Sequence, residues 1–248
     1  METAEFIEVL RRDGGLLADA AEAAGPDARV PSCPGWRVRD LVRHQGAVHR
    51  WATRFVAEGR TRPEPIAAET PEDDAQLVPW FREGHERLVA ALDAAPADLE
   101  CWYFLKAPSP LAFWARRQAH ETAVHRVDAE LALGRTPSPV EPRFAADGID
   151  ELLAGFHIRE RSRVRSEKPV TLRVRTVDTD TARDDWLARV SAGPMVVERP
   201  ASGEADCTVS GTAEELYLTL WNRGPYEKLQ VTGDASLLDL WRRTAGIG

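Results

Sequence analysis

The sequence predicts an α+β protein of two domains, in which an all-α four-helix bundle is followed by a small α+β domain. The first half of the chain holds four long segments with apolar residues at helical spacing. The second half changes to short segments that alternate apolar and polar residues, as half-buried strands do. Between the two halves, residues 135–144 contain three prolines, which is typical of a linker. We therefore expect domains at residues 1–136 and 145–248.

Each helix of the first half is delimited by apolar periodicity and by a stop signal. The helices are expected at residues 3–24, 36–58, 75–95 and 110–133. Gly25, Gly59 and Gly134 follow the first, second and fourth of them, as glycine commonly does at the end of a helix. A proline- and acid-rich connector, 61–74, separates the second helix from the third and should form a surface loop.

The second half mixes strands and helices. Strands are expected at residues 170–177, 186–190, 195–198, 207–210 and 229–233. Helices are expected at residues 149–161, 212–221 and 236–244. Thr212 and Glu215 have the spacing of a capping box, which marks the start of the middle helix.

Composition and charge exclude several classes of protein. The chain has 248 residues, 43% hydrophobic and 29% charged, close to globular averages. Its net charge is −8 and its basic residues are scattered, so nucleic acid and anionic membranes are poor partners. The three cysteines are widely spaced and no apolar run reaches the ~20 residues of a membrane span. We expect a cytoplasmic protein, monomeric or a small homo-oligomer, that acts on a small molecule.

Four of the six histidines form two pairs, His44 with His49 and His120 with His125. Residues five apart on a helix are separated by about 140° in projection, so neither pair can point at one site. Residues four apart differ by only about 40°, which brings Glu121 and His125 to the same face. This Glu-x-x-x-His spacing differs from the zinc-protease motif His-Glu-x-x-His.

The second helix offers two histidines on different faces. His49 falls in the middle of an apolar stripe that includes Val42 and Val56, so we expect its ring to point into the bundle. His44 falls near the edge of that stripe. A buried imidazole needs a polar partner. We expect to find that partner on the fourth helix.

His49, Glu121 and His125 are therefore the candidate metal ligands. Two imidazoles and one carboxylate from facing helices form a three-ligand site with open positions, as in catalytic zinc and some iron enzymes. The alternatives are a hydrogen-bonded cluster without metal and a solvated face. His44 and His120 are not expected to be ligands.

The remaining candidates have simpler interpretations. His85 and His157 are expected at the surface or at an interface, and His120 is expected in the core or next to a metal ligand. Asp128 lies three residues beyond His125 and either orients that ring or forms a salt bridge. The cysteines are expected to be structural.

Two segments resemble the mycothiol-dependent maleylpyruvate isomerase family of actinobacteria: VPSCPGWRVRDLVRHQGAVHRWA, residues 30–52, and HETAVHRVDAE, residues 120–130. The resemblance implies a DinB-like metal-binding four-helix bundle followed by a sterol-carrier-like domain. It also implies His49, Glu121 and His125 as ligands of a divalent metal, expected to be Zn²⁺, and mycothiol as the thiol cosubstrate. Arg223, in the segment Leu-Trp-Asn-Arg, matches the family's catalytic arginine, although a residue at a helix end can equally be a cap.

The resemblance implies a metal- and thiol-dependent isomerase of an unsaturated keto-dicarboxylate such as maleylpyruvate. The reaction would proceed by thiolate addition, rotation about the resulting single bond and elimination. Two alternatives remain at this stage. One is another mycothiol-dependent transferase or detoxification enzyme, and the other is a non-catalytic protein that binds a metal or a ligand.

Overall fold

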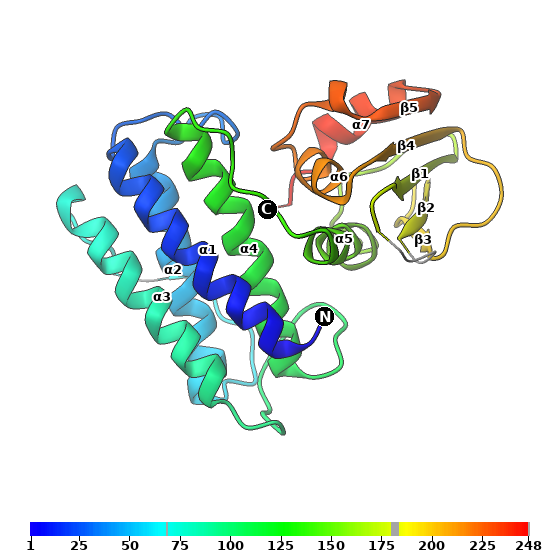
Figure 1. The fold of residues 1–248 in the computed structure, drawn as a ribbon. Coiled ribbons are helices and arrows are strands. Elements are labelled where there is room, and N and C mark those ends of the chain that lie inside the picture. Colours follow the sequence, from blue (N-terminus) through cyan, green and yellow to red (C-terminus); the bar gives the residue numbers. More distant parts are fainter. Residues whose placement is uncertain (68, 180–183, 248) are drawn as a thin grey trace. The chain divides into compact units, whose positions relative to one another are not determined.

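The computed structural model describes residues 1–67, 69–179 and 184–247. The chain divides into two compact units, Met1–Ser138 and Pro139–Gly248. In the described residues the first unit is helical and the second contains a five-stranded sheet with helices (Figure 1). This confirms the predicted α+β fold class. Among the described residues, no helix is both long and apolar enough to cross a bilayer.

Four helices run side by side in the first unit (Figure 1). They are α1 (Thr3–Ala24), α2 (Val38–Glu58), α3 (Leu77–Ala94) and α4 (Pro110–Ala132), with a short 3₁₀ turn, η1 (Asp74–Gln76), before α3. Helix α1 packs chiefly against α4, and α2 against α3. At the start of α4 the Ser109 hydroxyl accepts a hydrogen bond from the Ala112 amide, and Pro110 occupies the first turn. Each helix begins and ends within two residues of its predicted bounds.

Helix α4 is buried around most of its circumference, and many of its buried side chains are polar. A buried polar group must be paired, so these residues form hydrogen-bonded sets. One such set is structural. Arg126 donates to Glu130 at 2.7 Å and to the Ser138 carbonyl at 2.6 Å, and the Ser138 amide and hydroxyl both donate to Glu130. The other set lies closer to the middle of the helix and forms the candidate site described below.

The second unit is built on a five-stranded sheet with the strand order β3-β2-β1-β4-β5. The strands are β1 (Val170–Thr176), β2 (Asp185–Val190), β3 (Val196–Glu198), β4 (Cys207–Gly211) and β5 (Gln230–Gly233). Only β1 and β4, among these strands, pair in parallel; the other neighbours are antiparallel. Val174, Trp186 and Val209 lie opposite one another on adjacent strands and are fully buried.

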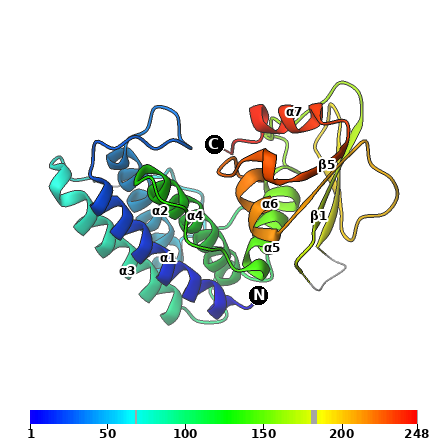
Figure 2. The same ribbon diagram turned by 45° about the horizontal axis from the view of Figure 1, so that its top comes forward.

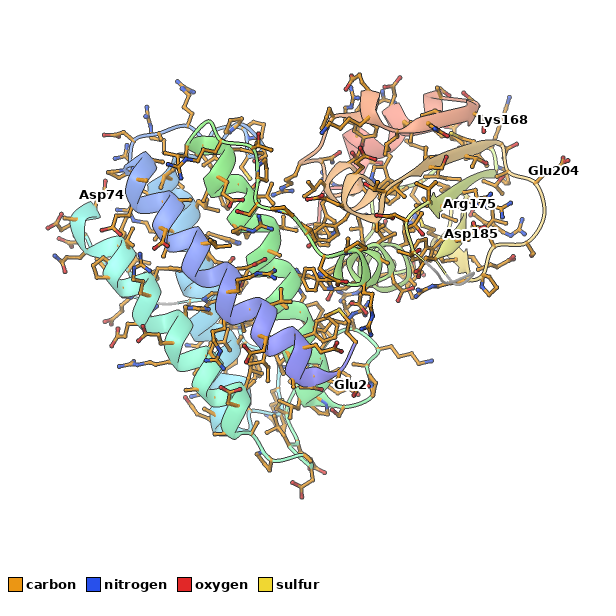
Figure 3. The ribbon with its side chains drawn as sticks, viewed as in Figure 1. Glu2, Asp74, Lys168, Arg175, Asp185 and Glu204 are labelled. Carbon is orange, nitrogen blue, oxygen red and sulfur yellow. The ribbon has the colours of Figure 1, made fainter. Side chains whose placement is uncertain are left out.

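The helices of this unit cover one face of the sheet (Figure 2). They are α5 (Pro142–Asp150), which continues into a π-helical turn η2 (Glu151–Phe156), α6 (Ala213–Leu220) and α7 (Ser236–Thr244); a 3₁₀ turn, η3 (Tyr226–Lys228), precedes β5. Most strand residues on the other face are polar, although Leu187, opposite Arg173, is buried. There Asp185 accepts two hydrogen bonds from Arg173 and lies directly opposite Arg175 in the sheet register (Figure 3).

The start of α5 and the burial of two histidines differ from what the sequence predicts. Helix α5 begins at Pro142, seven residues before the predicted start, because a proline in the first turn begins a helix as readily as it ends one. His85 and His157 are buried, with 7% and 1% of their area exposed. His85 Nε2 lies 2.9 Å from the Leu10 carbonyl oxygen, and the His157 ring packs edge-on against Trp241. An imidazole can be buried when a partner inside accepts or donates a hydrogen bond, as the Leu10 carbonyl does for His85 and the Ser162 hydroxyl does for His157 Nδ1.

Candidate metal centre

Three side chains of the bundle bring potential metal donors together: His44 of α2, and Glu121 and His125 of α4. Their donor atoms all lie within 4.8 Å of one another. Glu121 Oε1 is 3.5 Å from His44 Nε2 and 3.5 Å from His125 Nε2. Two ligands at zinc distances in a tetrahedral site are about 3.3 Å apart. The spacing of these donors therefore fits a metal ion held between them.

The sequence places the three donors by helical geometry. Glu121 and His125 are four residues apart and share a face of α4. The side chains grade from exposed to buried, with 34% of His44, 20% of Glu121 and 9% of His125 exposed. Trp36 packs against both imidazoles, its ring centroid 5.1 Å from that of His44 and 6.1 Å from that of His125. The site is thus open to solvent beside His44 and closed beside His125.

Asp128 fixes the orientation of His125. Its Oδ2 lies 2.8 Å from His125 Nδ1, and because a carboxylate only accepts, that nitrogen carries the proton. The Ser32 hydroxyl and the Cys33 thiol donate to the same carboxylate. With Nδ1 bonded to Asp128, Nε2 is the nitrogen that faces Glu121, and it is the one that would bind a metal ion after losing its proton. Of the two roles considered for Asp128, the geometry supports orientation of His125.

The charges around the site favour a cation. Burial by itself would lower the pKa of His125, but the hydrogen bond with Asp128 and the nearby carboxylate of Glu121 raise that pKa to about 9. Burial would raise the pKa of Glu121, but the Arg117 guanidinium and the two imidazoles hold it well below its ordinary value. The two carboxylates thus stabilise a positive charge at His125, and a bound metal ion would supply such a charge too.

The structure places His44, and not His49, beside Glu121 and His125. His49 is fully buried, with Nε2 2.8 Å from Thr122 Oγ1 and 2.9 Å from Gln45 Nε2. Its burial lowers its pKa well below the ordinary value and keeps the ring neutral. His49 points into the bundle as expected, but its partners there are neutral groups on α2 and α4.

The position of His44 beside Glu121 and His125, where His49 was expected, has a simple geometric cause. His44 and His49 point about 140° apart around α2. The centre of the apolar stripe identifies the residue that enters the core, whereas this site lies at the edge of the stripe, where His44 is half-exposed. Gln45 lies four residues before His49 on the same face of α2. This spacing is the signal in the sequence that His49 could bond to Gln45 instead of to Glu121 or His125. His120 is buried against Phe6 and does not join the site.

Arg223 lies in the second unit, directly after α6. The backbone of Asn222 is left-handed, with φ at 60°, and the Arg223 guanidinium donates from Nη1 to the Trp221 carbonyl oxygen at 2.7 Å. This contact is the helix-capping arrangement considered in the sequence analysis. A catalytic role for Arg223 remains a prediction.

The chain matches two family models that together span most of its length. Residues 8–130 match the mycothiol maleylpyruvate isomerase N-terminal domain, and residues 143–240 match the C-terminal domain of the same enzyme family. No curated protein matches the chain.

Solved structures show the same fold. A crystal structure of mycothiol-dependent maleylpyruvate isomerase superposes with a TM-score of 0.59 at 15% identity, and its histidine-to-alanine mutant with 0.60 at 14%; each comparison covers 95% of both chains. A ubiquinone synthesis protein with a sterol-carrier-type domain matches 43% of this chain with a TM-score of 0.26, too low to establish a common fold. The two family models, on the separate bundle and sheet units, decide the assignment: the chain belongs to the mycothiol-dependent maleylpyruvate isomerase family.

Proposed function

We propose that the protein is a metal- and thiol-dependent cis-trans isomerase. Its substrate would be an unsaturated keto-dicarboxylate such as maleylpyruvate, with mycothiol as the thiol cosubstrate. The observation that carries the proposal is the convergence of His44, Glu121 and His125 in a chain of this family. Two imidazoles, one carboxylate and a second carboxylate behind one imidazole are typical of a catalytic zinc site.

The side chains of the bundle have distinct roles in this proposal. His44, Glu121 and His125 would hold a divalent metal, expected to be Zn²⁺. When bound, such a metal lowers the pKa of a thiol that reaches it and so provides thiolate near neutral pH. Asp128 keeps the proton of His125 on Nδ1. Trp36 shields the two imidazoles on one side and limits the access of water.

The reaction needs only addition and elimination of the thiol. The cosubstrate thiolate adds to one carbon of the cis double bond, and the electron pair of that bond moves toward the keto oxygen. The remaining single bond rotates. The electron pair then returns to form the trans double bond and the thiolate leaves, so that no atom is gained or lost. We propose that Arg223 binds a substrate carboxylate through two hydrogen bonds and offsets the developing negative charge.

Metal content and turnover should be measured together on the purified, zinc-loaded protein. We expect maleylpyruvate to isomerise only when both metal and mycothiol are present, with glutathione as the comparison thiol. His44→Ala should lose both the metal and the activity. His49→Gln is the matched control and should retain the metal, because Gln can still bond to Thr122. Retention of the metal in His44→Ala together with its loss in His49→Gln would restore the original ligand assignment.

Arg223→Lys tests the role of the second unit. If the guanidinium acts only in the transition state, kcat and kcat/KM should both fall by on the order of 10²-fold, with metal content unchanged. An unchanged kcat would leave Arg223 with its capping role alone. Metal binding and thiol consumption without isomerisation would indicate a mycothiol-dependent transferase instead.

A further inference from the structure

The two oxygens of Glu121 have different surroundings. Oε1 faces His44 Nε2 and His125 Nε2, each at 3.5 Å. Oε2 accepts a hydrogen bond from Arg117 Nη2 at 2.7 Å. Arg117 lies four residues before Glu121 on the same face of α4, and only 3% of its side chain is exposed. One oxygen is therefore tied to a buried cation and the other is directed at the imidazoles.

A second arginine-glutamate pair on α4, Arg126 with Glu130, has the same spacing but takes no part in the candidate metal site. Arg126 and Glu130 have the same four-residue spacing and the same contact of 2.7 Å. Both oxygens of Glu130 accept hydrogen bonds from Ser138 as well. Among the described residues, Oε1 of Glu121 has no donor at a comparable distance, since 3.5 Å is long for a hydrogen bond. Glu130 is saturated by the protein, whereas Glu121 keeps one oxygen available.

We propose that Arg117 is a positioning residue that restricts Glu121 to one-oxygen coordination of the metal. This inference rests on the metal centre of the proposed function. A carboxylate without other partners can bind a metal through both oxygens. A charge-assisted hydrogen bond on Oε2 opposes the second contact. The Arg117 side chain is 3% exposed, so little water can replace its contact with Glu121.

Restricting Glu121 has a consequence for the reaction. Each oxygen withheld from the metal leaves one coordination position for water, thiol or substrate. Arg117 would therefore keep open the position that the cosubstrate uses, without touching the cosubstrate itself. This predicts that loss of Arg117 leaves metal binding intact or stronger while it closes part of the site.

Mn²⁺ provides a direct measure of the open positions. This ion prefers six ligands. With one oxygen from Glu121, three protein donors leave three positions for water; with two oxygens, two positions remain. The relaxation of water protons by a bound Mn²⁺ ion scales with the number of waters that it holds. We expect Arg117→Met to lower the relaxivity per bound ion by about one third, from three waters to two.

Two control variants separate positioning from stability. Arg117→Lys keeps a cationic donor four residues from Glu121 and should restore the wild-type relaxivity. Arg126→Met removes the structural pair, and should lower the melting temperature without changing the relaxivity per bound ion. Arg117→Leu replaces the methionine variant if that variant does not fold.

The outcomes distinguish this inference from the proposed function. A one-third drop in relaxivity with Mn²⁺ affinity equal to or tighter than wild type supports the role of Arg117. Weaker Mn²⁺ binding with unchanged relaxivity per bound ion would show that Arg117 only supports the fold, and would overturn the inference alone. A wild-type protein that binds neither Mn²⁺ nor Zn²⁺ would overturn the proposed function together with it.

Discussion

Two adjacent glycines in α1 should respond in opposite directions to the same substitution. A β-carbon at Gly14 would lie 2.2, 2.4 and 2.5 Å from three ring atoms of His85, whereas one at Gly15 would meet nothing within 4 Å. Alanine is about 1 kcal/mol better than glycine inside a helix. Gly15→Ala should therefore raise the free energy of unfolding by up to about 1 kcal/mol.

Gly14→Ala has the same helical gain but must displace the His85 ring. That ring bonds to the Leu10 carbonyl oxygen and stacks on Phe81, with ring centroids 6.0 Å apart. Overpacking costs about 1–3 kcal/mol, and loss of the hydrogen bond adds about 1 kcal/mol. After the helical gain is subtracted, Gly14→Ala should lower the free energy of unfolding by about 1–3 kcal/mol.

The free energies of unfolding of Gly14→Ala, Gly15→Ala and the wild type can be compared by urea unfolding monitored by circular dichroism. The midpoints should lie on opposite sides of the wild type. At the thermal midpoint, each kcal/mol corresponds to about 2–4 °C in a chain of this size. Equal stabilisation by both alanines would refute the packing of His85 against Gly14.

Two further predictions concern His157 and Asp128. Burial lowers the pKa of His157 to about 4, below the ordinary 6.5, so the unfolded chain binds the extra proton between these values. The contribution of His157 to stability is complete above pH 6.5 and is lost as the pH falls toward 4, by about 2 kcal/mol at pH 5. Urea unfolding at pH 7 and pH 5 should show this loss in the wild type and less of it in His157→Phe; equal pH dependence in both contradicts the assignment. Asp128→Asn should weaken zinc binding by about 10–100-fold in competition with a chromophoric chelator, because it loosens the hold on His125 Nδ1. Unchanged affinity would show that Ser32, Cys33 and core packing orient the ring without the charge.

The helices and strands could be predicted because their signals are local. Apolar spacing and the glycines after α2 and α4 mark the helices, and alternation marks β1. The start of α5 was missed because Pro142 has the same appearance in a linker as in a first helical turn. Sequence spacing alone does not say on which side of a proline the helix lies.

Two of the three candidate donors can be predicted from one helix, α4, whereas the third depends on how α2 packs against α4. Glu121 and His125 share a face of α4, so their proximity is fixed by helical geometry. The choice between His44 and His49 depends on how α2 is rotated and shifted against α4. That register is set by packing across the bundle, and by contacts such as His49 with Thr122 that join distant parts of the chain.

Asp128 also contributes to this register. It hydrogen-bonds to His125 on its own helix and to Ser32 and Cys33, which precede α2 by a few residues. One buried carboxylate therefore ties the segment leading into α2 to the helix that carries two of the three donors. Because His44 lies two turns into α2, its height relative to His125 depends on where that segment is anchored. The ring orientation of His125 and the placement of His44 thus share a cause, and a substitution at Asp128 should disturb both imidazoles rather than one.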